Sequence, residues 1–78
     1  MTAGERLRAL RLARVLTQEA LSQKANVSQV TIARIESGKY SPRFSTIHKL
    51  AAALGVSPEE FMEGIELTQE KVEGARAA

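Results

Sequence analysis

Between Ser28 and Arg34 the chain collects side chains that could bind the edges of nucleic-acid bases. The amide of Gln29 can form two hydrogen bonds with adenine, and the guanidinium of Arg34 can form two with guanine. Val30 could contact the methyl group of thymine, and the hydroxyl of Ser28 or Thr31 could bond a base edge or a phosphate. These residue types indicate recognition by contact rather than catalysis.

The chain lacks the residues that most enzyme and metal sites need. It contains no cysteine and no aspartate, and His48 is its single histidine. A thiolate nucleophile, a Ser-His-Asp arrangement and a histidine cluster are therefore excluded, and the sequence has no glycine-rich phosphate-binding loop. We expect no enzymatic activity, no metal and no cofactor, and we expect His48 to be a surface residue.

Charge is distributed unevenly along the 78 residues, whose formal net charge is +2. Residues 1–50 hold nine lysines and arginines against three glutamates, whereas residues 51–78 hold two against six. A positive field on one part of a small domain attracts polyanions, although charged residues are also typical of solvated helix faces. For Arg6, Arg8 and Arg14 we favour the solvated alternative.

Length and hydropathy predict one small cytoplasmic domain. A chain of 78 residues suits a single domain, and its longest apolar runs are far too short for a membrane span. The sequence does not open with a basic segment followed by the apolar segment of a signal peptide. We expect the domain to cover residues 1–65 and a partly ordered or short helical tail to cover residues 66–78.

Apolar periodicity and the residues that start and stop helices predict an all-α protein with five helices. Thr17, Ser28 and Ser57 are placed to cap helices, and Ser57 is followed by proline and then by glutamate at the spacing of a capping box. Gly38 and Gly55 are placed to end helices. The expected helices cover about residues 4–14, 18–24, 29–36, 45–54 and 58–63.

Residues 18–37 have the spacing of a helix-turn-helix, because only about three or four residues separate the second helix from the third. Asn26 lies where the chain must reverse, and asparagine tolerates the left-handed conformation. Leu21 from one helix and Ile32 and Ile35 from the other would share a small core. The remaining face has short polar donors near the helix start and a long cation further along, which suits the major groove of DNA.

The sequence resembles the lambda-type Cro/repressor family of helix-turn-helix proteins, also called the xenobiotic-response-element family, in the string TQEALSQKANVSQVTIARIESGKYSPRFSTIHKLAAALGVS and in the LRALR before it. The resemblance covers roughly residues 5–63 and combines LR.LR, TQ..L, the turn, I..IE.G, a downstream proline and a terminal LAAALGVS. It implies a compact five-helix bundle, from a prokaryote or phage, whose third helix reads the major groove of double-stranded DNA.

Three positions depart from the family pattern. The family usually has glycine in the inter-helix turn, where this chain has Asn26, and alanine after the packed leucine, where it has Ser22. Both substitutions are mild. The family also usually has glycine between the first two helices, where this chain has Val15, and a β-branched residue is poorly suited to a positive φ. We therefore expect a continuous or differently bent corner at Val15.

The resemblance also implies roles for the residues around the third helix. Arg11 and Glu36 would form an ion pair that joins the first helix to the end of the third. Gln18 would lie at a helix N-terminus, where backbone N–H groups favour an anion. The implied base-reading residues are Ser28, Gln29, Val30, Thr31 and Arg34, and the implied phosphate-contacting residues are Gln18, Lys39, Tyr40, Arg43 and Ser45. For each, the alternative is an ordinary solvated side chain.

One short recognition helix reads only a few base pairs, so this and the family resemblance lead us to expect a homodimer on an inverted-repeat operator. The resemblance implies a transcriptional regulator, expected to be a repressor that blocks polymerase at a promoter; the alternative is that it recruits polymerase from a neighbouring site. The dimer surface is expected around five apolar residues: Phe44, Val56, Phe61, Met62 and Ile65. For Phe44, Phe61 and Met62 the alternative is a place in the core. Two alternatives stay open. One is an antitoxin, which would also bind a toxin, with the tail as a possible site for the protein partner. The other is the controller protein of a restriction–modification system.

Overall fold

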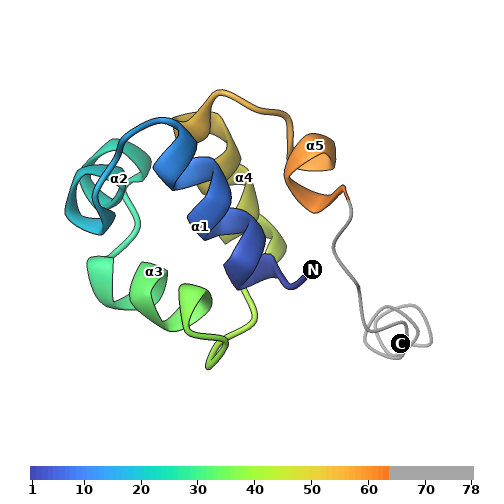
Figure 1. Cartoon of the computed structure of the whole chain (residues 1–78), viewed down its shortest axis with the longest axis horizontal. Helices are drawn as coiled ribbons and strands as arrows, with labels where there is room; N and C mark the ends of the chain where they lie inside the picture. Colours follow the sequence, from blue (N-terminus) through green and yellow to red (C-terminus); the bar gives the residue numbers. More distant parts are fainter. Residues whose placement is uncertain (64–78) are drawn as a thin grey trace.

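The computed structural model describes residues 1–63, which fold into five helices around one core (Figure 1). The helices are α1 (Ala3–Ala13), α2 (Gln18–Ala25), α3 (Gln29–Glu36), α4 (Phe44–Leu54) and α5 (Pro58–Met62). This arrangement confirms the predicted all-α, five-helix class. The predicted tail over residues 66–78 lies outside the described residues. Within residues 1–63, no helix combines the length and the hydropathy that a membrane crossing needs.

Side-chain caps fix where the helices begin. Thr17 caps α2 by accepting a backbone N–H bond of 2.9 Å, as predicted. Ser57 and Glu60 form the predicted capping box of α5, with bonds of 3.0 and 3.1 Å. Thr2 forms an equivalent box at the start of α1. The N-cap of α4 is Arg43, which makes no side-chain cap bond, so the first backbone N–H groups of α4 have no such acceptor.

Residues in the left-handed region end two of these helices. Asn26, with φ 58° and ψ 43°, ends α2, and Gly55, with φ 76°, ends α4, both as predicted. Our expectation for Val15 is wrong, because it adopts φ 55° and keeps the left-handed corner between α1 and α2. The N–H groups of Val15 and Leu16 bond back to carbonyls of α1 at 2.9 and 3.1 Å. These bonds hold the corner against the preference of valine.

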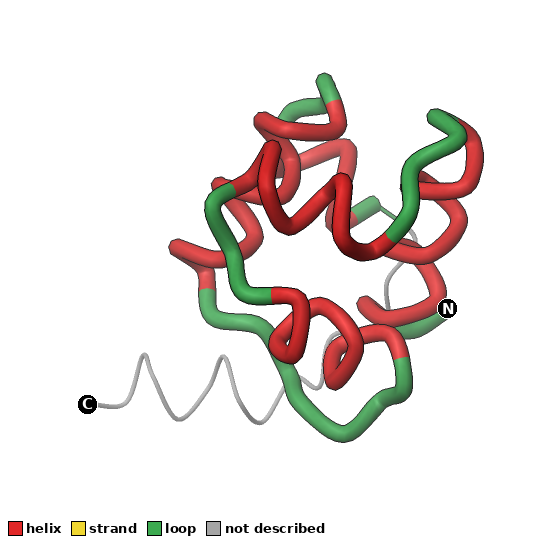
Figure 2. Tube along the Cα trace, turned by 90° about the vertical axis from the view of Figure 1, so that its left-hand side faces the viewer, coloured by secondary structure: helices red, strands yellow, loops and turns green. Residues whose placement is uncertain are grey.

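The core is made by one apolar face of each helix. α1 packs on α3 and α5, α2 packs on α3 and α4, and α4 packs on α5. The helices thus surround a centre that apolar side chains fill (Figure 2). The largest fully buried side chains are those of Leu7, Leu21, Ile32, Ile35, Leu50, Leu54 and Phe61.

Candidate nucleic-acid interface

Two buried isoleucines set the rotation of α3. Ile32 and Ile35 are 0% and 1% exposed and belong to the core. Because side chains on the opposite side of a helix point away from its buried stripe, the remaining positions face outward. Gln29, Val30 and Arg34 are exposed, and Val30 keeps 66% of its surface accessible. These three residues, the α3 reading face, lie on a helix at the edge of the molecule (Figure 1).

Ser28 and Thr31 lie beside the α3 reading face but are partly engaged with each other. The Oγ of Ser28 accepts the backbone N–H of Thr31 at 3.0 Å and donates to the Oγ1 of Thr31 at 2.9 Å. Ser28 is exposed and Thr31 is half-buried. The Ser28 hydroxyl therefore uses its proton within the cap, while the bond leaves Thr31 its own hydroxyl proton for another acceptor.

Arg11 and Glu36 form an ion pair between α1 and the last residue of α3. The Nε and Nη2 atoms of Arg11 donate to the two carboxylate oxygens of Glu36 at 2.7 and 3.0 Å, and its Nη1 donates to the carbonyl of Leu16 at 2.7 Å. The two charged side chains are only 8% and 4% exposed. The hydrogen bond to Glu36 raises the pKa of Arg11, against the lowering that burial causes. The pair therefore holds the end of α3 against α1.

Gln18 extends this ion pair to α2. Its Nε2 donates to the Oε1 of Glu36 at 3.1 Å, and the residue is half-buried. One donor of the amide is therefore directed at a protein carboxylate. The backbone N–H of Gln18 belongs to the first turn of α2, where such groups have no partner within the helix and favour an anion. Gln18 therefore keeps its second amide N–H and its backbone N–H as possible donors to an anion.

The loop between α3 and α4, together with the first turn of α4, carries the other predicted phosphate ligands. Lys39, Tyr40, Arg43 and Ser45 are all exposed. The backbone N–H of Lys39 donates to the carbonyl of Arg34 at 2.9 Å, so the loop begins directly against the end of α3. Two cations and two hydroxyls therefore follow the α3 reading face along the surface. No three His, Cys, Asp or Glu side chains among residues 1–63 are grouped to hold a metal ion.

Comparison with known proteins agrees with this geometry. A sequence profile described as helix-turn-helix matches residues 7–61, which include all of α2 and α3 and the loop that follows. The chain belongs to the Cro/C1-type helix-turn-helix family. Members of this family bind DNA, and their fold is the lambda repressor-like bundle described above. The predicted family and fold are thereby confirmed.

Individual relatives of this Cro/C1-type chain cover different shares of its length. The immunity repressor protein of Bacillus phage phi105 is 46% identical over 56 residues, which are 72% of this chain and 39% of that protein. The DNA-binding domain of the P22 c2 repressor superposes with a TM-score of 0.77 at 33% identity, covering 82% of this chain and 84% of that one. The restriction–modification controller protein C.AhdI from Aeromonas hydrophila superposes with a TM-score of 0.73 at 36% identity, covering 76% and 89%. The chain spans 39% to 44% of the length of three curated relatives.

Two arginines of this Cro/C1-type chain have roles that the sequence did not indicate. We expected Arg6 and Arg14 to be solvated charges. This expectation is wrong for Arg6, which is half-buried, whereas Arg14 is exposed as expected but also bonds a distant carbonyl. The Nη2 of Arg6 donates to the carbonyl of Glu60 on α5 at 2.8 Å, and the Nε of Arg14 donates to the carbonyl of Leu54 at the end of α4. The partners are 54 and 40 residues apart in sequence, so no local pattern could have shown them.

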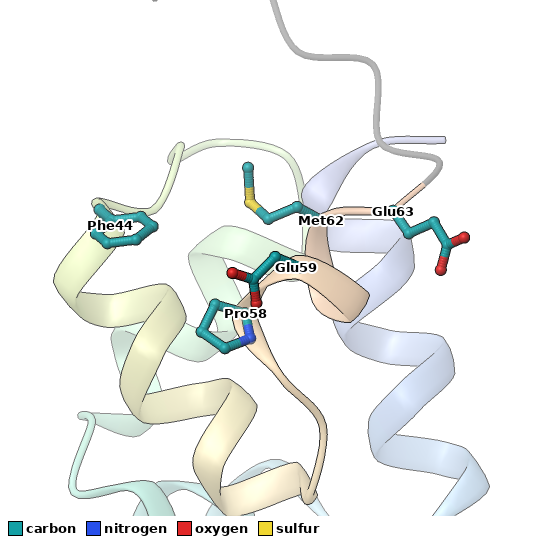
Figure 3. A pocket seen from close by; sticks show the side chains of 5 residues that line it. All are labelled: Phe44, Pro58, Glu59, Met62 and Glu63. Atoms are coloured by element: carbon teal, nitrogen blue, oxygen red, sulfur yellow. The ribbon is translucent and has the colours of Figure 1, made fainter.

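A groove between α4 and α5 collects part of the predicted dimer surface (Figure 3). Phe44, in the first turn of α4, is 65% exposed, and its ring meets that of His48 edge-on with centroids 4.5 Å apart. Met62 is half-buried on α5 across the groove. The groove is lined by Phe44, Pro58, Glu59, Met62 and Glu63.

The other predicted dimer residues lie elsewhere. The assignment of Phe61 needs correction, because its side chain is 0% exposed and belongs to the core. Val56 is half-buried against that core. Ile65 lies outside the described residues.

Proposed function

We propose that the chain is a sequence-specific regulator that binds double-stranded DNA and represses transcription by occupying a promoter. The observation that carries this proposal is the outward α3 reading face, held in place by two buried isoleucines. The relatives support it, since they include an immunity repressor and the DNA-binding domain of another repressor. The action is steric and involves no catalysis, and we place it in the cytoplasm of a prokaryote, on the nucleoid.

The α3 reading face offers three kinds of contact in the major groove. The amide of Gln29 presents a donor and an acceptor that match N7 and N6 of adenine. The methyl groups of Val30 can pack on the methyl group of thymine, and this contact would bury a valine that is exposed in the free protein. Arg34, about one turn further along, can fork onto guanine or hold a phosphate. Ser28 and Thr31 contribute weaker contacts, chiefly through the free hydroxyl proton of Thr31.

Contacts on both sides of the α3 reading face would fix its register on the duplex. On one side, the backbone N–H of Gln18 would bind a phosphate at the start of α2. On the other side, the ammonium of Lys39 and the guanidinium of Arg43 would bind phosphates and release counterions. Tyr40 could add a hydroxyl, and Ser45 could add a backbone N–H in the uncapped first turn of α4.

A second copy of the chain would complete the DNA site, because one short helix reads only a few base pairs. The groove between α4 and α5 supports this proposal, since Phe44 is a large aromatic residue left mostly exposed beside Met62. An isologous contact through this groove would relate two copies by a two-fold axis, which is the symmetry that an inverted repeat requires. Ile65 and the half-buried Val56 would be peripheral to it.

One alternative has specific support. The controller protein C.AhdI superposes over 89% of its own length, so a controller role in a restriction–modification system fits the size and fold of this chain. A controller would use the same α3 reading face on DNA. The antitoxin alternative and a protein partner for the tail depend on residues 66–78, which lie outside the described part of the chain.

Selection of bound sequences from a random pool of DNA duplexes tests the proposal. We expect enrichment of an inverted repeat whose half-sites are about one helical turn apart. Gln23, exposed on α2, provides a matched control: Gln23→Ala should select the same sequence, and Gln29→Ala should relax one position in each half-site. Failure to enrich any sequence at low ionic strength would contradict DNA recognition, and a single unrepeated half-site would contradict the dimer.

A further inference from the structure

The helix that forms one wall of the groove is held mainly by its neighbours. α5 has only five residues, and a helix this short has little stability in water by itself. The buried ring of Phe61 fixes one side of it to the core. Its capping box, made by Ser57 and Glu60, fixes its first turn. Neither feature supplies a hydrogen bond between α5 and α1.

Arg6 supplies such a bond. Its Nη2 donates to the carbonyl of Glu60 at 2.8 Å, and this oxygen also accepts the N–H of Glu63 at 3.2 Å at the end of α5. Carbonyls in a last helical turn have no later N–H within the helix, and a cationic donor suits them. The side chain of Arg6 is half-buried, and its Nε is enclosed without an acceptor. A freely solvated arginine would leave its Nε in water.

We propose that Arg6 is a positioning residue that holds α5 against α1 and so keeps the groove in the shape that a second copy binds. The inference depends on the proposed homodimer. Met62 stands on α5 and Phe44 on α4, so the separation of these two helices decides how the two apolar side chains present themselves (Figure 3). α5 packs on both α1 and α4, and Arg6 acts on its α1 side.

Replacing Arg6 by methionine separates positioning from simple packing. Methionine keeps most of the apolar stem of arginine and removes both the carbonyl bond and the enclosed Nε. If the stem alone mattered, Arg6→Met would be neutral or stabilising, because an apolar replacement relieves the unpaired polar atom. Arg6→Lys keeps a cation that can reach a carbonyl and should restore part of the function. Arg8, exposed on the same helix, gives the control Arg8→Met.

Sedimentation equilibrium of the full chain provides the first measurement. We expect Arg6→Met to raise the dimer dissociation constant at least about tenfold, because tenfold corresponds to the low end of the range for a single hydrogen bond to a charged group. Arg6→Lys should lie between Arg6→Met and wild type, and Arg8→Met should match wild type. If Arg6→Met dimerises as tightly as Arg8→Met, the inference is wrong. If the wild-type chain stays monomeric at every concentration, the homodimer fails instead.

Amide hydrogen exchange provides the second measurement, and it does not require a dimer. In Arg6→Met we expect faster exchange at the amides of Phe61 and Met62, with unchanged protection in α2 and α3. Exchange that rises equally throughout the chain would mean that Arg6 supports global stability, and the inference would be overturned. If Arg6→Met folds poorly, the exchange rates of Arg6→Lys are compared with those of Arg8→Met instead. The same pattern is expected, with a smaller increase at Phe61 and Met62.

Discussion

Gly4 of α1 lies directly against the carbonyl oxygen of Ile35 at the end of α3. A β carbon at this position would stand 2.2 Å from that oxygen and 3.0 Å from the carbonyl oxygen of Glu36. Both atoms belong to the backbone of α3 and cannot move aside as a flexible side chain would. The absence of a side chain at Gly4 therefore allows α1 to cross the end of α3 at this distance.

Gly4→Ala should destabilise the fold although alanine is the better helix former. The added methyl group would force α1 and α3 apart, and we expect a loss of about 2 kcal/mol in the free energy of unfolding. In an open helix the same change would gain about 1 kcal/mol. Urea unfolding measures both effects. Ala9→Gly, the reverse change at an exposed site of α1, gives the difference in helix propensity between alanine and glycine. Equal or greater stability of Gly4→Ala would refute the close approach.

The Arg11–Glu36 pair predicts strong coupling between two substitutions. Because both side chains are almost fully enclosed, Arg11→Met alone should cost about 3 kcal/mol by leaving a buried carboxylate unpaired. Glu36→Met alone should cost a similar amount, because it leaves the buried guanidinium of Arg11 without its carboxylate. The double variant should be much less destabilised than the sum of the two, because two apolar side chains leave no unpaired charge. Additive losses in urea unfolding would show that the pair is solvated.

The pH dependence of this pair follows from the direction of the pKa shift. Glu36 raises the pKa of Arg11. For a cation whose pKa is raised on folding, the stabilisation is complete below the unfolded-state pKa and disappears as pH rises through the folded-state value. Arginine already titrates far above neutrality, so Arg11 should keep its full contribution from pH 6 to about pH 10. A difference in unfolding free energy between wild type and Arg11→Met that shrinks over this range would contradict the assignment.

Val15 should be a site where stability can be gained. It holds φ 55° and is 88% exposed, so the folded chain gains little from its side chain there. A left-handed conformation costs an ordinary residue about 1–2 kcal/mol. Val15→Asn should therefore raise the free energy of unfolding by about 1 kcal/mol. Val15→Ala removes the branching at the β carbon but has no polar side chain to bond the nearby backbone, so it should gain less. A loss of stability in Val15→Asn would show that valine is not strained at this corner.

The features that the sequence predicted are local ones. Ser57 and its glutamate lie three residues apart, and Asn26 follows directly after the helix that it ends. Ile32 and Ile35 repeat at helical spacing. In each case neighbours along the chain decide the geometry, so residue type and spacing were enough to predict the helix-turn-helix and its outward face.

The features that the sequence did not predict depend on residues far apart in the chain. Arg6 and Arg14 bond carbonyls of helices that arrive only after the chain has folded back. The bond from Gln18 to Glu36 likewise needs the final packing of α2 against α3. Val15 shows the converse, because tertiary context imposed a conformation that its residue type disfavours.

The proposed role of the α3 reading face is tested most directly by comparing Gln29→Ala with Lys39→Ala on a duplex library and at several salt concentrations. Gln29→Ala should lose about 1–3 kcal/mol of discrimination at one base pair and leave the salt dependence unchanged. Lys39→Ala should weaken binding to all duplexes alike and reduce the slope of log K against log salt by about one. The reverse pattern, or unchanged base preference in Gln29→Ala, would contradict the placement of α3 in the major groove.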